Sequence, residues 1–231
     1  MGAWFTDTLV LLQDNRAELW EGLVITLQLW AASGVGGLVL ALGLALGATH
    51  GGTVTKSLVR FYSAALRGTP LLVQMFLLYY GLSQFEWVRA SAAWVVLEDA
   101  LYCGLIALTL NIAAYMAEDI RAGILAVPPG QQEAARAFGM STGTLLRRIV
   151  LPQALRIATP ALGNEGVALL KATALVSTIT VFDLTGVARR LSTESYSTDA
   201  LVLAGVVYGV LTLLISAGVH LLERHRKSHA A

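Results

Sequence analysis

The chain has 231 residues, of which 56% are hydrophobic and 13% charged, and its formal net charge is +1. Soluble domains carry about 25% charged residues, so this apolar excess predicts a protein with much of its surface in lipid. The near-neutral charge gives no indication of nucleic-acid binding. The single cysteine, Cys103, excludes an internal disulfide and a cysteine-based metal cluster, and we interpret it as a packing residue.

The N-terminal segment does not have the pattern of a cleavable signal peptide. It carries Asp7, Asp14 and Glu18 where a signal peptide has a basic region. The charge-free stretch that follows predicts a first membrane span over residues 23–48, which is longer than the apolar region of a signal peptide. We therefore expect this span to remain in the mature protein.

Further apolar stretches follow along the chain, and a membrane-spanning helix needs roughly 20 apolar residues. The second stretch is interrupted by Arg67-Gly68-Thr69-Pro70, so its helix is expected to be short or kinked at the proline. The fourth contains Glu165 and Lys171, and the fifth is broken only by His220. The sequence thus predicts one all-α membrane domain over 1–231, with five spans near 23–48, 61–85, 100–120, 157–182 and 200–222.

Basic residues are concentrated on one side of the predicted spans. The segments after the first and third spans, together with the C-terminal tail, hold most of the 16 Lys and Arg residues. The positive-inside rule then places the N-terminus outside and the C-terminus in the cytoplasm. The residues on the cytoplasmic side are Lys56, Arg60, Arg67, Arg121, Arg136, Arg147, Arg148, Arg156, Arg224, Arg226 and Lys227.

The longest segment between spans has the pattern of two short helices joined at a glycine. Val127-Pro128-Pro129-Gly130 ends the third span, an alanine-rich helix follows, and Gly139 is a plausible C-cap. Ser141 then begins an amphipathic helix, and Leu151-Pro152 is expected to close the segment. Such a pair fits a docking element at the cytoplasmic surface, and equally an amphipathic pair lying on lipid headgroups.

Motifs in this segment point to a family. Glu133-Ala134-Ala135, followed by Gly139 and then Ile149-Val150-Leu151-Pro152, resembles the EAA loop of permease subunits of binding-protein-dependent ABC importers. Residues 67–74, 108–124 and 153–177 resemble the second, third and fourth spans of the polar amino-acid branch. Asn164-Glu165, Ala188-Arg189 and Tyr196 resemble most the group of histidine, lysine/arginine/ornithine and opine permeases.

This resemblance implies a type I importer permease fold in a bacterial inner membrane. It implies a second permease subunit, here a related chain, two copies of a cytoplasmic ATP-binding subunit and a periplasmic solute-binding protein. In the family the EAA loop, residues 127–152 here, couples the permease to the ATPase. The coupling residues carried over are Glu133, Ala134, Ala135, Arg136 and Gly139.

The chain itself has no pattern of an ATPase. Gly51 to Ser57 comes nearest to a phosphate-binding loop, but Thr55 precedes Lys56 where a glycine is required, and no strand leads into it. We expect no enzymatic activity and no bound cofactor, with ATP used by the partner subunit. We expect no metal site either, because the histidines lie at membrane edges or in the basic tail: His50, His220, His225 and His229.

Polar residues inside the spans are the candidates for substrate contact, because ionisable groups there are costly and often functional. Glu165 needs a cation, supplied either by another helix or by the substrate. Asn164 is its neighbour, while Lys171 points away from it on the same helix. Asn111 and Gln74 can hydrogen-bond in the same cavity, although such residues more often join helices. The predicted substrate-binding residues are Glu165, Asn164, Asn111 and Gln74.

Two alternatives remain from sequence alone. A secondary transporter or channel for a small polar solute also carries intramembrane charges, but the chain shows no inverted repeat and no filter-like loop. A membrane-embedded enzyme requires clustered ligands at one depth, which the spans lack. The outer segment 183–199 fits a binding-protein contact, an external gate or a solvated loop.

Overall fold

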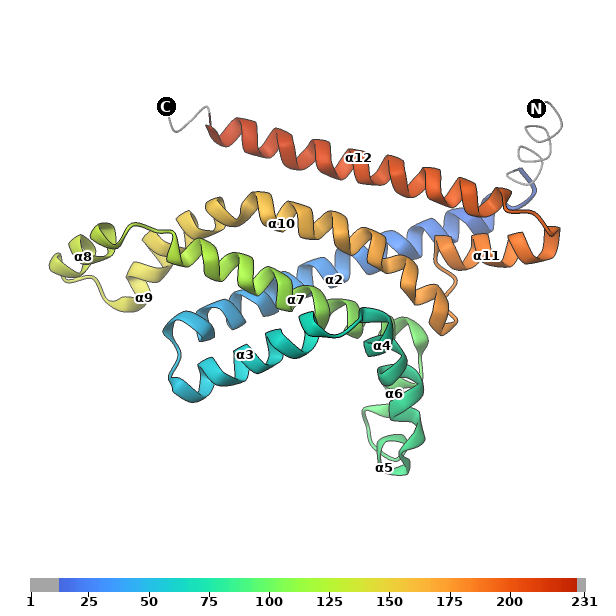
Figure 1. The fold of residues 1–231 in the computed structure, drawn as a ribbon, viewed down its shortest axis with the longest axis horizontal. Coiled ribbons are helices and arrows are strands. Elements are labelled where there is room, and N and C mark those ends of the chain that lie inside the picture. Colours follow the sequence, from blue (N-terminus) through green and yellow to red (C-terminus); the bar gives the residue numbers. More distant parts are fainter. Residues whose placement is uncertain (1–12, 228–231) are drawn as a thin grey trace.

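The computed structural model describes residues 13–227, which form helices and turns with no strand among them. Asp7, His229 and the side chains of residues 222–227 lie outside the described residues. Four long helices dominate the architecture (Figure 1). They are α2 (Arg16–His50), α7 (Ala100–Leu125), α10 (Leu151–Thr173) and α12 (Asp199–Lys227).

Helices α2 and α7 pack along one another more extensively than any other pair of described elements. The buried positions of α2 fall every three or four residues and are mostly small, which lets the two backbones approach closely. At Gly37 a Cβ would lie 2.4 Å from Ile112 Cγ2, so this contact requires glycine. The buried residues of α2 are Leu19, Gly22, Thr26, Leu29, Ser33, Gly37, Ala41 and Ala45.

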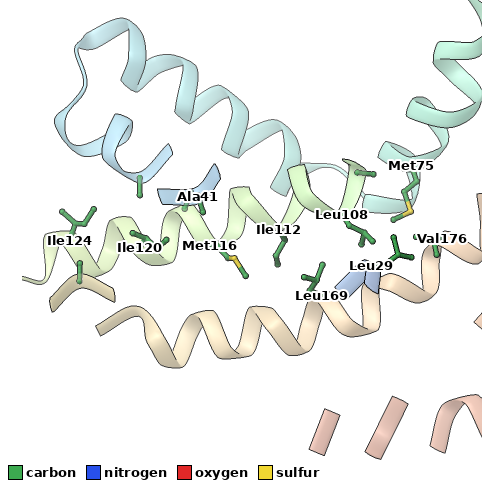
Figure 2. Close-up of a cluster of buried hydrophobic side chains, with 14 of the residues drawn as sticks. Leu29, Ala41, Met75, Leu108, Ile112, Met116, Ile120, Ile124, Leu169 and Val176 are labelled. Atoms are coloured by element: carbon green, nitrogen blue, oxygen red, sulfur yellow. The ribbon is translucent and has the colours of Figure 1, made fainter. Parts of the chain in front are cut away.

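The apolar core is centred on α7, which packs against both α2 and α10 (Figure 2). Leu108, Ile112, Met116 and Ile120 recur every fourth residue of α7 and are buried. Leu169 of α10 belongs to the same cluster. Helix α7 is therefore the central element, and polar groups on its remaining face are held at fixed positions.

The interruption expected at residues 67–70 is present. Helix α3 (Thr53–Gly68) ends there, Thr69 and Pro70 are extended, and α4 (Leu71–Phe76) begins on the other side. Proline restricts the residue before it to extended backbone, which accounts for the break. A π-helical turn η1 (Leu77–Gly81), a 3₁₀ turn η2 (Leu82–Gln84) and the short helices α5 (Glu86–Arg89) and α6 (Trp94–Leu97) lead to α7.

The segment after α7 contains α8 (Pro129–Ala137) and α9 (Thr142–Leu145), followed by a π-helical turn η3 (Leu146–Val150). The expectation that Leu151-Pro152 closes this segment is wrong, because the helical path continues from Thr142 to Ile179. Pro152 lies in the first turn of α10, directly after η3, where a missing N–H donor is tolerated. The fourth apolar helix therefore begins well before residue 157.

The chain then bends and returns. Turn η4 (Ala174–Ile179) leads to α11 (Leu184–Ser195), and α12 follows. Within the part of the chain that the structure describes, three helices are long and apolar enough to cross a membrane: Arg16–His50, Ala100–Leu125 and Asp199–Leu221. A further candidate is the pair Thr142–Ile179 and Leu184–Ser195, which is bent by 51°, while Leu71–Gln84 is apolar but shorter. This is a multi-pass membrane protein.

Different helices lie at the two ends of the bundle. Helices α8 and α9 lie at one end, together with the turn between α2 and α3, whereas α11 lies at the opposite end (Figure 1). The helix-glycine-helix segment and the outer segment 183–199 are therefore separated by the length of the bundle.

Candidate functional site

Two of the predicted substrate contacts line the same cavity. A cavity of about 320 Å³ lies between α7, α10 and the start of α4, and both Glu165 and Asn111 border it. Apolar side chains and the ring of Tyr115 form the rest of its wall. The full lining is Leu71, Leu108, Asn111, Ile112, Tyr115, Glu165, Ala168, Leu169 and Ala172.

The Glu165 carboxylate has no close cationic partner in this cavity. Among the residues that the structure describes, no hydrogen bond or ion pair within 4.0 Å involves Glu165, which is half-buried. Lys171 is exposed on the same helix and does not pair with it. A carboxylate placed in an apolar cavity is costly unless a cation or hydrogen-bond donor meets it. The cavity thus suits a solute with a cationic group.

Asn111 and Gln74 form a connected pair at the break between α3 and α4. Asn111 Nδ2 donates to Gln74 Oε1 at 3.1 Å and to the Leu66 carbonyl at 3.0 Å. Gln74 Nε2 donates to the same carbonyl at 2.8 Å and to Thr69 Oγ1 at 2.8 Å. The Leu66 carbonyl in the last turn of α3, where carbonyls lack partners within the helix, is satisfied in this way.

The four predicted substrate residues therefore have different environments. Glu165 and Asn111 line the same cavity. Gln74 accepts a hydrogen bond from Asn111 and borders a separate apolar pocket of about 260 Å³. Asn164 occupies an exposed position of α10 and does not line the cavity. Tyr115 was not among the predicted contacts, although its spacing of four residues from Asn111 places both on one face of α7.

The helix-glycine-helix segment has the expected local geometry. Gly139 has φ +76°, and its N–H donates to the Arg136 carbonyl at 2.9 Å. Met140 N–H reaches back to the Ala135 carbonyl at 3.0 Å. Ser141 caps α9 by accepting a hydrogen bond from Thr144 N–H. The predicted C-cap glycine and the helix start at Ser141 are both confirmed.

The predicted coupling residues do not all face the same way. Glu133, Ala134 and Arg136 are exposed on α8, but Ala135 is buried within the chain's own core. Phe138 is 90% exposed at the end of this helix, a large apolar side chain that sequence reasoning did not single out. An open groove of about 730 Å³ runs beside α8, and Gln153 Nε2 donates across it to Gln131 Oε1 at 2.7 Å.

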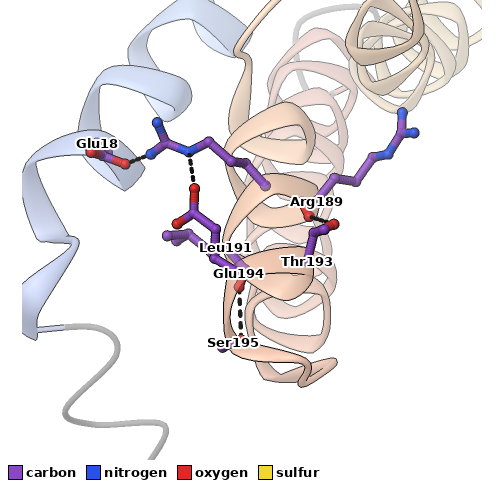
Figure 3. A network of polar contacts seen from close by, with 7 residues as sticks. Glu18, Arg189, Leu191, Thr193, Glu194 and Ser195 are labelled. Carbon is purple, nitrogen blue, oxygen red and sulfur yellow. Dashed lines mark hydrogen bonds and ion pairs between the residues drawn. The ribbon is translucent and has the colours of Figure 1, made fainter.

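The opposite end of the bundle carries an ion-pair network (Figure 3). Arg190 of α11 pairs with Glu18 at the start of α2 and lies 3.7 Å from Glu194. Arg190 Cζ is also 5.8 Å from the centre of the Phe182 ring. The network fixes α11 against α2, so the outer segment is a helix held to the bundle rather than a solvated loop. Near the end of α7 that leads to α8, Arg121 pairs with Glu118 at 2.8 Å.

Comparison with known proteins identifies relatives over most of the chain. Residues 37–228 match the family model described as binding-protein-dependent transport system inner membrane component. The chain is 47% identical to the octopine transport system permease protein OccM of Rhizobium radiobacter, over 92% of this chain and 87% of that protein. It is 39% identical to the histidine/lysine/arginine/ornithine transport system permease protein HisM of Escherichia coli K12, over 84% and 82% of the two chains.

Solved structures of ABC transporters also match most of the chain. A crystal structure of an amino acid ABC transporter with histidines matches with a TM-score of 0.81 and 36% identity, covering 93% of this chain and 96% of the other. The MetNI methionine transporter in an inward-facing conformation matches with a TM-score of 0.78 over 92% and 97% of the chains. Its identity is only 20%, so that second match concerns the fold alone.

Proposed function

The chain belongs to the family of binding-protein-dependent transport system inner membrane components, and from this premise we propose a site and a class of cargo for it. It is a permease subunit of an ATP-driven amino-acid importer. The cargo is a basic amino acid or an opine, and the cavity beside Glu165 holds its cationic group.

The observation that carries this proposal is the Glu165 carboxylate in its cavity. No described side chain forms an ion pair with it, and the surrounding wall is largely apolar. A guanidinium or ammonium group entering the cavity supplies the missing charge and forms a charge-assisted hydrogen bond. Asn111 borders the same cavity, and its amide oxygen is available to the cargo while its nitrogen is engaged by Leu66 and Gln74. Gln74 then supports Asn111, and Asn164 has no part in the contact.

The assembly follows from the family and from the shape of the chain. A second, related permease subunit completes the path, and two copies of a separate ATP-binding subunit use the ATP. Glu133, Ala134, Arg136 and Phe138 face the ATP-binding subunit, while Ala135 allows α8 to pack against its own chain. Gly139 provides the turn between the two helices.

The placement in the membrane completes the proposal. The chain crosses a bacterial inner membrane five times, with α3 to η2 as a broken second span and α10 with η4 as the fourth. The N-terminus lies outside and the C-terminus inside. A periplasmic solute-binding protein meets the end of the bundle that contains α11, opposite to α8.

Replacing Glu165 by Gln tests the cargo site, because it keeps the shape and removes the charge. Uptake of arginine by the reconstituted complex should fall about 10- to 100-fold, the equivalent of a lost hydrogen bond to a charged group of about 1.5–3 kcal/mol. Basal ATP hydrolysis and co-purification with the partner subunits should persist. Lys171→Gln, which removes an exposed charge from the same helix, should have little effect. Unchanged uptake in Glu165→Gln, or its failure to assemble, would assign Glu165 a structural role.

A further inference from the structure

Tyr115 borders two cavities. On one side it lines the cavity that contains Glu165 and Asn111. On the other it lines a more open cavity of about 540 Å³, which Arg67, Ser63 and Glu118 also border. Glu118 is closer than Tyr115 to the end of α7 from which α8 follows, so the second cavity lies toward the coupling end of the bundle. Tyr115 is the residue that the two cavities share.

Arg67, which borders the second cavity, makes a cation–π contact with this ring. Its guanidinium carbon lies 5.2 Å from the centre of the Tyr115 ring, a distance at which a cation is attracted to the aromatic face. Arg67 lies in the last turn of α3, where the helix dipole favours a positive charge. The neighbouring Leu66 carbonyl accepts hydrogen bonds from both Asn111 and Gln74, so the backbone beside Arg67 is fixed in place.

Arg67 shares its cavity with a carboxylate of α7. Glu118 borders the same cavity of about 540 Å³. Asp119 Oδ2 is buried and has no hydrogen-bond partner among the described residues. Arg67 thus has an acidic side chain in its own cavity and the Tyr115 ring within cation–π distance.

We propose that the stack of Arg67 on Tyr115 is the inner gate of the Glu165 cavity, and that a cationic group of the cargo opens it by taking over the role of Arg67. This inference rests on the proposed cargo site. A guanidinium or ammonium group beside Glu165 offers the Tyr115 ring, which borders the same cavity, a second cation. Arg67 is then free to turn into the open cavity, toward Glu118. A neutral solute of similar shape does not supply this cation and leaves the gate closed.

A cysteine inside the Glu165 cavity reports whether the gate is open. Ala172 lines that cavity, is partly buried and lies seven residues from Glu165 on the same helix, so Ala172→Cys is placed in a Cys103→Ala chain. The complete complex is studied in inside-out vesicles without binding protein, and the rate of labelling by an impermeant thiol reagent is measured. Millimolar guanidinium should raise the rate about tenfold, whereas urea, which has the same shape and no charge, should leave it unchanged.

Variants of the gate should change the rate without any cation present. Arg67→Gln and Tyr115→Leu should each label about tenfold faster than the parent, and added guanidinium should no longer matter. Tyr115→Phe keeps the aromatic face and should behave as the parent does. Tyr102→Leu, a tyrosine of the same helix that lines neither cavity, should also be unchanged.

Two results would overturn the gate. One is a labelling rate in Arg67→Gln equal to that of the parent. This result would exclude the gate even if Tyr115→Leu fails to assemble. The other is an equal response to guanidinium and urea. The cargo site is tested independently of the gate, because arginine uptake by Glu165→Gln does not depend on the labelling rate.

Discussion

Tyr208 of α12 donates a hydrogen bond of 3.1 Å from its hydroxyl to Oδ2 of Asp183, the residue that caps the start of α11. The other carboxylate oxygen of Asp183 accepts from Gly186 N–H at 2.9 Å. Beside them Leu184 N–H donates to Thr26 Oγ1 of α2 at 3.1 Å. Helix α2 thus meets α11 and α12, which are far from it in the sequence, at one buried polar point.

Removing the Asp183 carboxylate should destabilise this end of the bundle. Asp183→Ala leaves the Gly186 N–H without its partner and the Tyr208 hydroxyl without its acceptor in a buried place, and we expect a loss of about 2 kcal/mol. The measurement is the unfolding midpoint of the purified complex in detergent. Thr193→Ala removes an exposed hydroxyl from the same helix and should stay within about 0.5 kcal/mol of the parent. Equal midpoints for the two variants would refute the role of Asp183.

Gly139→Val should disturb the turn between α8 and α9. A β-branched residue at φ +76° is strained by roughly 1–2 kcal/mol, so the two helices must shift. We expect normal insertion, weaker co-purification with the ATP-binding subunit and loss of uptake. The matched control is Gly143→Val, which adds the same side chain in open space at a residue without positive φ. Full uptake with Gly139→Val at normal expression would contradict the coupling assignment.

Phe138→Ala should weaken binding of the ATP-binding subunit by about 2 kcal/mol, because large exposed aromatic side chains are frequent anchors of interfaces. Because the Phe138 side chain is exposed to solvent in the isolated chain, the stability of the permease itself should not change. Val54→Ala removes another exposed apolar group at the same end of the bundle and serves as the control. Affinity is measured by titrating the ATP-binding subunit onto the permease in nanodiscs. The same affinity for both variants would remove Phe138 from the interface.

Single cysteines at the two ends of the bundle test the orientation. In a Cys103→Ala chain, Tyr196→Cys follows α11 and replaces a side chain that is 97% exposed, whereas Thr53→Cys begins α3 at the opposite end. An impermeant reagent added to intact cells should label position 196 and spare position 53 until the cells are permeabilised. The reverse pattern would invert the topology and place α8 outside the cell.

Local signals in the sequence were sufficient for the backbone of the coupling segment and for the break in the second span. A glycine followed by Ser141 specifies a helix end and a new start within five residues, and Pro70 restricts the residue before it. Neither depends on distant parts of the chain. These features were therefore predictable without a structure.

Features that depend on how helices meet were not predictable in the same way. Asn111 and Gln74 are joined by a hydrogen bond only because α3 and α4 approach α7 side by side, and the sequence allowed both a cargo contact and interhelical bonding. The inward direction of Ala135 depends on where α9 lies. Pro152 fails to end its helix because a π-helical turn precedes it, and periodicity alone does not reveal such a turn.

The uninterrupted helical path from Thr142 to Ile179 sets a constraint on chain length. Leu145 at the coupling end and Glu165 in the cavity lie on that same path, so their directions about its axis are linked, at about 100° per residue. One inserted residue between them would turn Glu165 away from α7, whereas seven would nearly restore its direction but shift it by about 10 Å along the axis. Natural variation in this stretch should therefore consist of substitutions, with insertions and deletions confined to the turns on either side.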